Sequence, residues 1–134
     1  MIQRIQTIYM LLLVMINLFV IVSIDNDHQM YSPESIFGNF RSYINGYFFS
    51  EILALTFLIN IFLFSKPKFQ INILKISSIA LLLGLFSLFE ERPLKMSITD
   101  PGLIYFSISF FLIFMSVNAI NKDVSIINSS NRIR

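Results

Sequence analysis

LIYFSISFFLIFMSVNAI, residues 103–120, decides the fold class, because these 18 residues contain no charged side chain. A helix needs about 17–25 predominantly apolar residues, each rising 1.5 Å, to cross a hydrocarbon layer of roughly 30 Å. Three further apolar runs of similar length occur at residues 8–24, 47–64 and 73–89. The sequence therefore predicts an all-α membrane protein with four transmembrane helices.

The composition favours the same class over its soluble and β-rich alternatives. Apolar residues make up 55% of the chain and charged residues 13%, whereas a soluble domain has about 25% charged residues. A soluble four-helix bundle would show a polar face with a period of 3.6 residues, but residues 54–62 (ALTFLINIF) are apolar around almost the whole circumference. A membrane β-barrel would need alternating apolar and polar positions. The chain has no cysteine, which excludes disulfides and thiol-based redox or metal chemistry.

The links between the apolar runs predict a single domain with an up-down-up-down order. SKPK, residues 65–68, is too short for anything but a tight turn, and antiparallel helices joined by short links usually pack together. We expect helices at about residues 5–24, 47–65, 72–90 and 101–120, an outer loop at 25–46 and a tail at 121–134.

The charged residues predict that both termini lie in the cytoplasm. In a four-pass protein, seven of the ten Lys and Arg fall on the side that holds the termini, and seven of the eight Asp and Glu fall on the other. An excess of Lys and Arg marks the cytoplasmic side. The first apolar run exceeds the core of a signal peptide and lacks a small-x-small cleavage site, so we expect it to stay as the first helix. The net charge of +2 is no argument for a nucleic-acid partner.

Three segments together resemble a known family. MIQRIQTIYMLLL (1–13), FLFSKPKFQINILKI (62–76) and VNAINKDVSIINSSNRIR (117–134) are similar to a bacterial family catalogued as domain of unknown function 4293. The resemblance implies a small four-helix protein of the bacterial inner membrane, with this opening and an arginine–hydrophobe–arginine ending. The chain departs from the family in its tail, which is usually richer in Lys and Glu and here contains Val124, Ser125, Ile126 and Asn128. The resemblance implies no activity.

Glu51 is the candidate functional carboxylate, because it follows the start of the second apolar run by one helical turn. Acidic residues within a membrane are costly, and they mark ion or proton pathways when they face a bundle interior. Glu90, Glu91 and Arg92 leave the third helix at the same outer level, so a cluster of carboxylates could form there. The alternative is a structural Glu51 that reaches interfacial water or pairs with Arg41 or Arg92.

Other intramembrane polar and small residues favour helix association. Asn17, Asn60 and Asn118 are expected to hydrogen-bond to neighbouring helices rather than to a ligand. Small side chains recur on one face of the third helix and would let another helix approach closely, either from this chain or from another protein. This candidate helix-packing face consists of Ser77, Ala80, Gly84 and Ser87.

The sequence offers no catalytic, cofactor-binding or metal-binding signature. The one histidine, His28, lies near Asp25, Asp27 and Glu34, but a flexible loop does not fix metal ligands as a site requires. Our leading hypothesis is a non-enzymatic structural or accessory subunit that packs in the lipid bilayer with other membrane proteins. The alternative is a small homo-oligomeric transporter or channel that uses Glu51. The sequence does not assign a role to MIQRIQ or to the final Arg-Ile-Arg.

Overall fold

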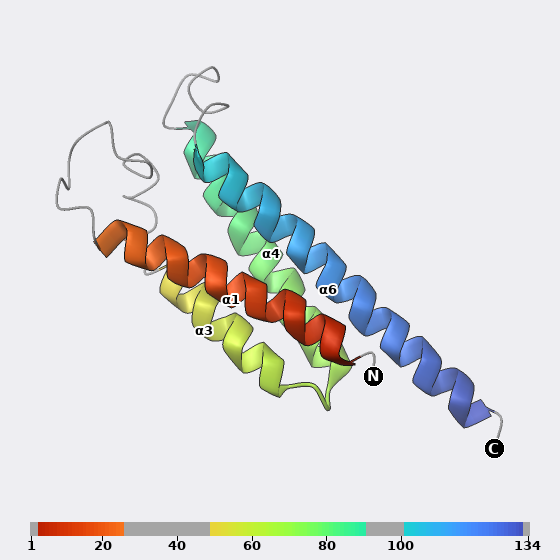
Figure 1. Cartoon of the computed structure of the whole chain (residues 1–134). Helices are drawn as coiled ribbons and strands as arrows, with labels where there is room; N and C mark the ends of the chain where they lie inside the picture. Colours follow the sequence, from red (N-terminus) through yellow and green to blue (C-terminus); the bar gives the residue numbers. More distant parts are fainter. Residues whose placement is uncertain (1–2, 26–48, 91–100, 133–134) are drawn as a thin grey trace.

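The structure is a computed structural model, and it describes residues 3–25, 49–90 and 101–132. Four helices make up this part of the chain, which contains no strand: α1 (Gln3–Asp25), α3 (Phe49–Phe62), α4 (Pro67–Glu90) and α6 (Pro101–Arg132) (Figure 1). The prediction of an all-helical chain is confirmed. The 25–46 loop beyond Asp25, including His28, and the Glu91–Arg92 pair lie outside the described residues.

The helix that contains residues 103–120 is longer than the sequence suggested. α6 continues to Arg132, through most of the segment 121–134 that we expected to be a tail. This segment contains no glycine or proline to end the helix. Ser125 and Ser129 donate hydrogen bonds to the carbonyl oxygens of Lys122 and Ile126, at 2.7 and 2.8 Å, and so bond within the helix rather than ending it.

The connection between α3 and α4 explains why these two helices differ from their expected ranges. α3 ends at Phe62, and the backbone N–H of Leu63 donates to Asn60 O at 3.2 Å in a closing turn. α4 begins at Pro67, five residues before the expected start. Proline suits the first position of a helix, where its missing N–H is not needed. The first bond of this helix follows, from the N–H of Gln70 to Lys66 O at 3.1 Å.

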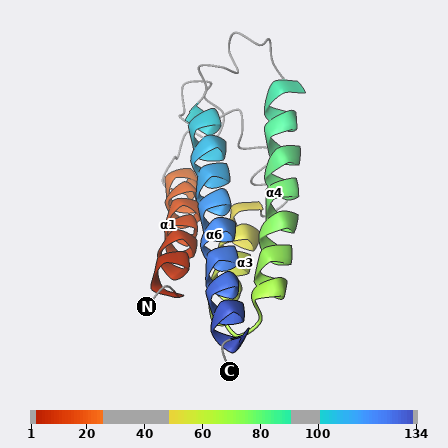
Figure 2. The ribbon, with the colours of Figure 1, turned by 90° about the vertical axis from the view of Figure 1, so that its right-hand side faces the viewer.

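The four helices pack side by side as a bundle in which α6 has two main neighbours. α1 packs against α3 and α6, and α4 packs against α6 and, less extensively, against α3. Figure 2 shows α6 in front of the others, with α1 and α4 on its two sides. The start of α1 and the end of α6 lie at the same end of the bundle as the turn between α3 and α4, and α6 projects beyond it (Figure 1).

The buried residues of each helix follow a seven-residue repeat. On α6 they recur at spacings of four and three, which is the pattern of helices that cross at a shallow angle of about 20°. α4 has the same spacing at Gln70, Leu74, Ser77, Leu81 and Gly84. The positions on α6 are residues 102, 106, 109, 113, 116, 120 and 123.

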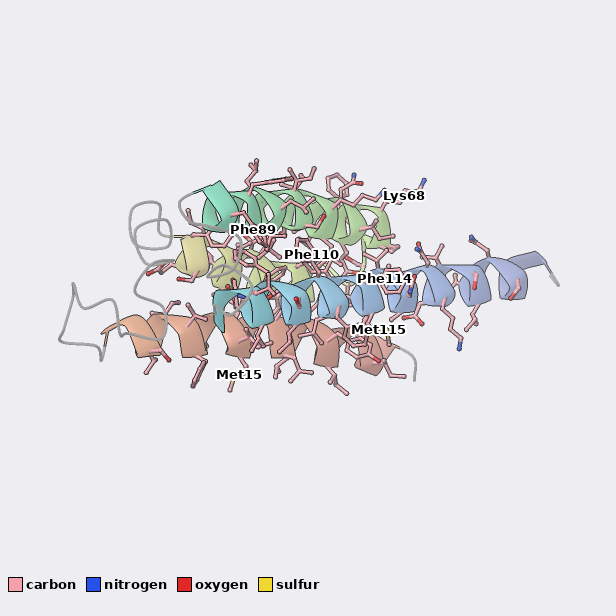
Figure 3. The ribbon with its side chains drawn as sticks, turned by 90° about the horizontal axis from the view of Figure 1, so that it is seen from above. Met15, Lys68, Phe89, Phe110, Phe114 and Met115 are labelled. Atoms are coloured by element: carbon pink, nitrogen blue, oxygen red, sulfur yellow. The ribbon has the colours of Figure 1, made fainter. Side chains whose placement is uncertain are left out.

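The bundle has polar side chains in its interior and large apolar ones on its exterior. Soluble proteins expose few contiguous apolar patches, but here Phe19, Phe62, Phe86 and Phe111 are each more than 60% exposed. Figure 3 shows Met15 on α1 pointing away from the other helices. The buried polar residues are Gln6, Asn17, Ser50, Asn60, Gln70, Ser77, Ser109, Ser116 and Asp123.

Three of the helices are long and apolar enough to cross a membrane. They contribute the segments Ile5–Ser23, Pro67–Phe86 and Gly102–Ser129. α3 is equally apolar but has only 14 residues, which span about 21 Å of the roughly 30 Å required. Length and composition therefore mark a membrane protein, with three full-length spans in the described residues.

Candidate functional site

Glu51, the candidate carboxylate, lies in the first turn of α3 and is exposed on the surface of the bundle. Its Oε2 accepts a hydrogen bond of 3.1 Å from the hydroxyl of the buried Ser50. An acidic residue in the first turn is stabilised by the helix dipole. The side chain of Glu90 is not among those described, so the carboxylate cluster expected beside Glu51 is not placed. Glu51 thus lies at the start of α3, on the outside of the described bundle, and does not line its interior.

Asn17, in the second half of α1, joins this helix to the beginning of α6, where Tyr105 lies. It is fully buried, its Nδ2 donates to Leu13 O at 2.8 Å, and its Oδ1 accepts from the hydroxyl of Tyr105 at 2.8 Å. Tyr105 is also buried and lies edge-on to the ring of Phe106, with the ring centroids 5.2 Å apart. Hydrogen bonds between membrane helices contribute on the order of 0.6–2 kcal/mol. This contact therefore fixes the register of α1 against α6.

Asn60 and Gln70 tie the end of α3 to the start of α4. Gln70 Nε2 donates to Asn60 O at 2.9 Å, and Asn60 Nδ2 donates in return to Gln70 O at 3.4 Å. Asn60 O is one of the last carbonyl groups of α3, which have no partner within their own helix. The side-chain oxygens of both residues are buried and have no hydrogen-bond partner within the described part of the chain.

The small-residue face of α4 is turned largely toward the rest of this chain. Ser77 and Gly84 are buried, and Ala80 packs against the apolar core. The side chain of Ser87 is not described. Asn118, by contrast, is exposed on α6 and does not take part in the packing of the described helices.

The feature that the sequence analysis missed is a cavity at the end of the bundle where α1 begins. It has a volume of about 210 Å³ and brings together residues from α1, the α3–α4 turn, α4 and α6. We call it the end cavity. Its lining consists of Gln6, Phe64, Ser65, Pro67, Gln70, Ile120, Asp123, Val124 and Ile127.

Three of the side chains that line the end cavity carry oxygen atoms with no hydrogen-bond partner among the described residues. Gln6 is 4% exposed, Gln70 1% and Asp123 7%. Gln6 Oε1, Gln70 Oε1 and both carboxylate oxygens of Asp123 are buried and have no hydrogen-bond partner among the described residues. Most buried polar groups in folded proteins do have partners, and each exception calls for an explanation.

The distance of Asp123 along α6 can be compared with the thickness of a bilayer. Asp123 follows the start of α6 at Pro101 by a distance of about 33 Å along the helix axis. This length matches a hydrocarbon layer of roughly 30 Å. A helix that enters the layer at its first turn therefore leaves it close to Asp123.

From the sequence, Asp123 was placed in the tail at 121–134, as the one acidic residue on the side that holds the termini. The signal that could have found it is the seven-residue spacing from Ser109 through Ser116 to Asp123, because that spacing puts all three on the buried face of a continued α6. Gln6 and Gln70 had no such signal, since both precede the apolar runs that drew attention.

The polar groups of the end cavity are oxygen-bearing side chains that could bind a ligand. No group of three or more His, Cys, Asp or Glu side chains comes together within residues 3–25, 49–90 and 101–132. The end cavity contains one carboxylate, two amide oxygens and the hydroxyl-bearing Ser65. Oxygens of this kind accept hydrogen bonds or coordinate cations.

A comparison with protein families matches residues 2–133 to the domain of unknown function DUF4293. The chain belongs to the DUF4293 family. This agrees with the resemblance carried by the MIQRIQ opening, the basic turn and the tail. Comparison of this DUF4293 chain with curated proteins and with solved structures gives no match. The family is described by its unknown function, so any role must be argued from the chain itself.

Proposed function

We propose that this chain is a non-enzymatic, multi-pass protein of the bacterial inner membrane that acts as a structural or accessory subunit and packs against other membrane proteins. The observation that supports this proposal most strongly is the reversed distribution of side chains, with large apolar residues outside and amides, hydroxyls and a carboxylate inside. An apolar exterior of this kind is favourable in contact with lipid tails and unfavourable in contact with water.

The helix surfaces leave ample area for partners. At most 39% of any of the three spanning segments is buried within the chain. Helices in a membrane associate through close packing and interhelical hydrogen bonds, because lipid supplies no hydrophobic drive between them. Exposed faces with Phe86 on α4 and Phe111 on α6 would then be shared between lipid and neighbouring proteins.

The proposed topology has four spans in up-down-up-down order with both termini in the cytoplasm. α3, with its 14 helical residues, would be the fourth span. Support comes from the excess of Lys and Arg on the side of the termini, which includes the exposed Lys66 and Lys68 at the α3–α4 turn. Figure 3 shows Lys68 pointing outward from α4.

The topology is tested by single-cysteine labelling, which the chain permits because it has no cysteine of its own. A cysteine placed at Lys68 or at Ser129 should react with a membrane-impermeant maleimide only after the cells are opened. Labelling of either position in intact cells would contradict the proposed topology.

The accessory role is tested by crosslinking the full chain in its native membrane, followed by mild detergent extraction. We expect a specific partner protein to be recovered with it, and recovery to depend on an exposed face rather than on the core. Replacing the exposed Phe86 with alanine should reduce recovery, whereas Leu81→Ala, a change in the core on the same helix, serves as the control. A strictly monomeric chain with no crosslinked partner would refute the role.

A second candidate is a homo-oligomeric transporter or channel, favoured by the exposure of Glu51 on α3. A carboxylate on the outside of one bundle could line a path only between several copies. If this candidate is correct, the Glu51→Gln variant should lose ion flux in liposomes. We expect the variant to behave like the unmodified protein, since the hydrogen bond from Ser50 and the helix start account for Glu51.

A further inference from the structure

We propose that the end cavity binds the primary ammonium group of an organic cation. This inference goes beyond the proposed function and does not depend on the chain being an accessory subunit. It rests on three buried side chains from three helices that line one cavity: Gln6 of α1, Gln70 of α4 and Asp123 of α6. Four oxygen atoms of these side chains have no hydrogen-bond partner within the described part of the chain.

The unpaired atoms define the chemistry of the ligand. All four are acceptors, so the missing partner is a donor of hydrogen bonds, and one of the three residues is a carboxylate, so the partner carries positive charge. Burying an ionised carboxylate without a partner is costly. A primary ammonium group has one positive charge and three N–H donors, which match the single Asp123 and the two amide oxygens.

The rest of the lining argues for a carbon-bearing cation rather than a metal ion. Five of the nine lining residues are apolar: Phe64, Pro67, Ile120, Val124 and Ile127. A metal ion bound by oxygen needs its ligands about 2.0–2.6 Å from a single point, but a cavity of about 210 Å³ is far larger than the roughly 10–15 Å³ that one water occupies. An alkylammonium fills this volume with its carbon chain against the apolar wall.

The position of the cavity allows two sources for the same group. Asp123 lies near the level at which α6 leaves the hydrocarbon layer, so the ammonium could belong to a soluble amine or to an ethanolamine lipid headgroup. The chemistry that recognises them is shared, and the experiment separates them.

The first arm measures thermal unfolding of the full chain in a zwitterionic detergent. n-Butylammonium chloride is compared with tetramethylammonium chloride and potassium chloride at equal ionic strength. Tetramethylammonium has the same charge but no N–H donor. At a concentration of roughly ten times Kd, butylammonium should raise Tm by about 5 °C, and the other two salts should not.

Single substitutions test which residues the rise in Tm with butylammonium depends on. Asp123→Asn should raise Tm in the absence of amine, because it removes an unpaired buried charge, and should abolish the response to butylammonium. Gln6→Met, which keeps the side-chain length and removes the acceptor, should weaken the response. Glu51→Gln is the matched control, since it neutralises a carboxylate at the other end of the bundle and should leave the response unchanged.

The second arm compares the chain in nanodiscs of phosphatidylethanolamine and of phosphatidylcholine, whose headgroups differ in their N–H donors. A higher Tm in phosphatidylethanolamine that disappears in Asp123→Asn identifies the lipid as the source, and a response to butylammonium alone identifies a soluble amine. Either result supports the proposal. Equal effects of potassium and butylammonium, a response that survives Asp123→Asn, or no response in either arm would overturn it.

Discussion

Phe111→Arg is expected to prevent α6 from entering the membrane. Phe111 is 61% exposed and lies about 15 Å along the helix from Pro101, which is close to the middle of a layer of roughly 30 Å. An arginine at the centre of a membrane helix costs about 2.5–3.5 kcal/mol on insertion scales, or roughly two orders of magnitude in the insertion equilibrium. On the surface of a soluble bundle the same change would be harmless.

The measurement is the accessibility of a single cysteine at Ser129 in intact cells, together with the fraction of the protein that resists alkaline extraction. Failure of α6 to insert should reduce that fraction and change the labelling of this cysteine. Ile127→Arg is the control, because Ile127 is also exposed on α6 but lies about 39 Å along the helix from Pro101, farther than a layer of roughly 30 Å that begins at the first turn would reach. Normal insertion of Phe111→Arg would contradict the membrane assignment.

Phe57→Ala is expected to destabilise the folded bundle by about 2 kcal/mol. Phe57 is the largest side chain with no exposed area in the core, and its removal leaves a cavity among α1, α3 and their neighbours. In a soluble protein the loss would be about 3–5 kcal/mol, of which roughly 1.5–3 comes from transfer of the side chain out of water. In a membrane, hydrocarbon surrounds Phe57 in the unfolded state as well, so the transfer contribution is absent. Only the loss of packing contacts then contributes to the change in the free energy of unfolding.

This loss is measured by reversible unfolding in mixed micelles, with Phe62→Ala as the control on the same helix. Phe62 is 72% exposed, and its replacement should change the free energy of unfolding by less than about 0.5 kcal/mol. Equal losses at the two positions would mean that the packing arrangement of α3 is wrong.

The helical class could be predicted from the sequence because the length of the uninterrupted apolar runs decides it. Uninterrupted apolar runs such as residues 103–120 satisfy all of their backbone hydrogen bonds internally only as helices when lipid surrounds them. The all-helical class and the family membership are confirmed. The orientation of the chain and its role stay predictions.

The ends of the helices were harder to predict. The apolar run of residues stops at the membrane boundary, whereas the helix can continue past it through polar residues. The polar residues 121–132 signalled a tail, yet the buried face of α6 continues at Ile120 and Asp123, and this packing supports further turns. Pro67 was assigned to a turn, although proline at the first position of a helix is favourable. Both the end of α6 and the start of α4 were misplaced because helix ends were assigned from hydropathy alone, without the backbone and packing geometry at those residues.

The end cavity could not be predicted, because its parts are far apart in the sequence. Gln6, Gln70 and Asp123 come together through the packing of α1 and α4 against α6 and the connection between α3 and α4. A single sequence indicates which residues are polar, but not which of them share a space. Asn17 was recognised because it interrupts an apolar run, and its partner Tyr105 was not.

The projection of α6 beyond the other helices has a practical consequence for fusion proteins. Arg132 follows Ile127, the last residue that lines the cavity, by five positions in one continuous helix, so a domain attached at the carboxyl end is carried about 8 Å beyond the cavity lining. α1 begins only a few residues before Gln6, and a bulky domain attached there would crowd the cavity. Reporter and affinity modules therefore belong at the carboxyl end, where the rod holds them at a distance.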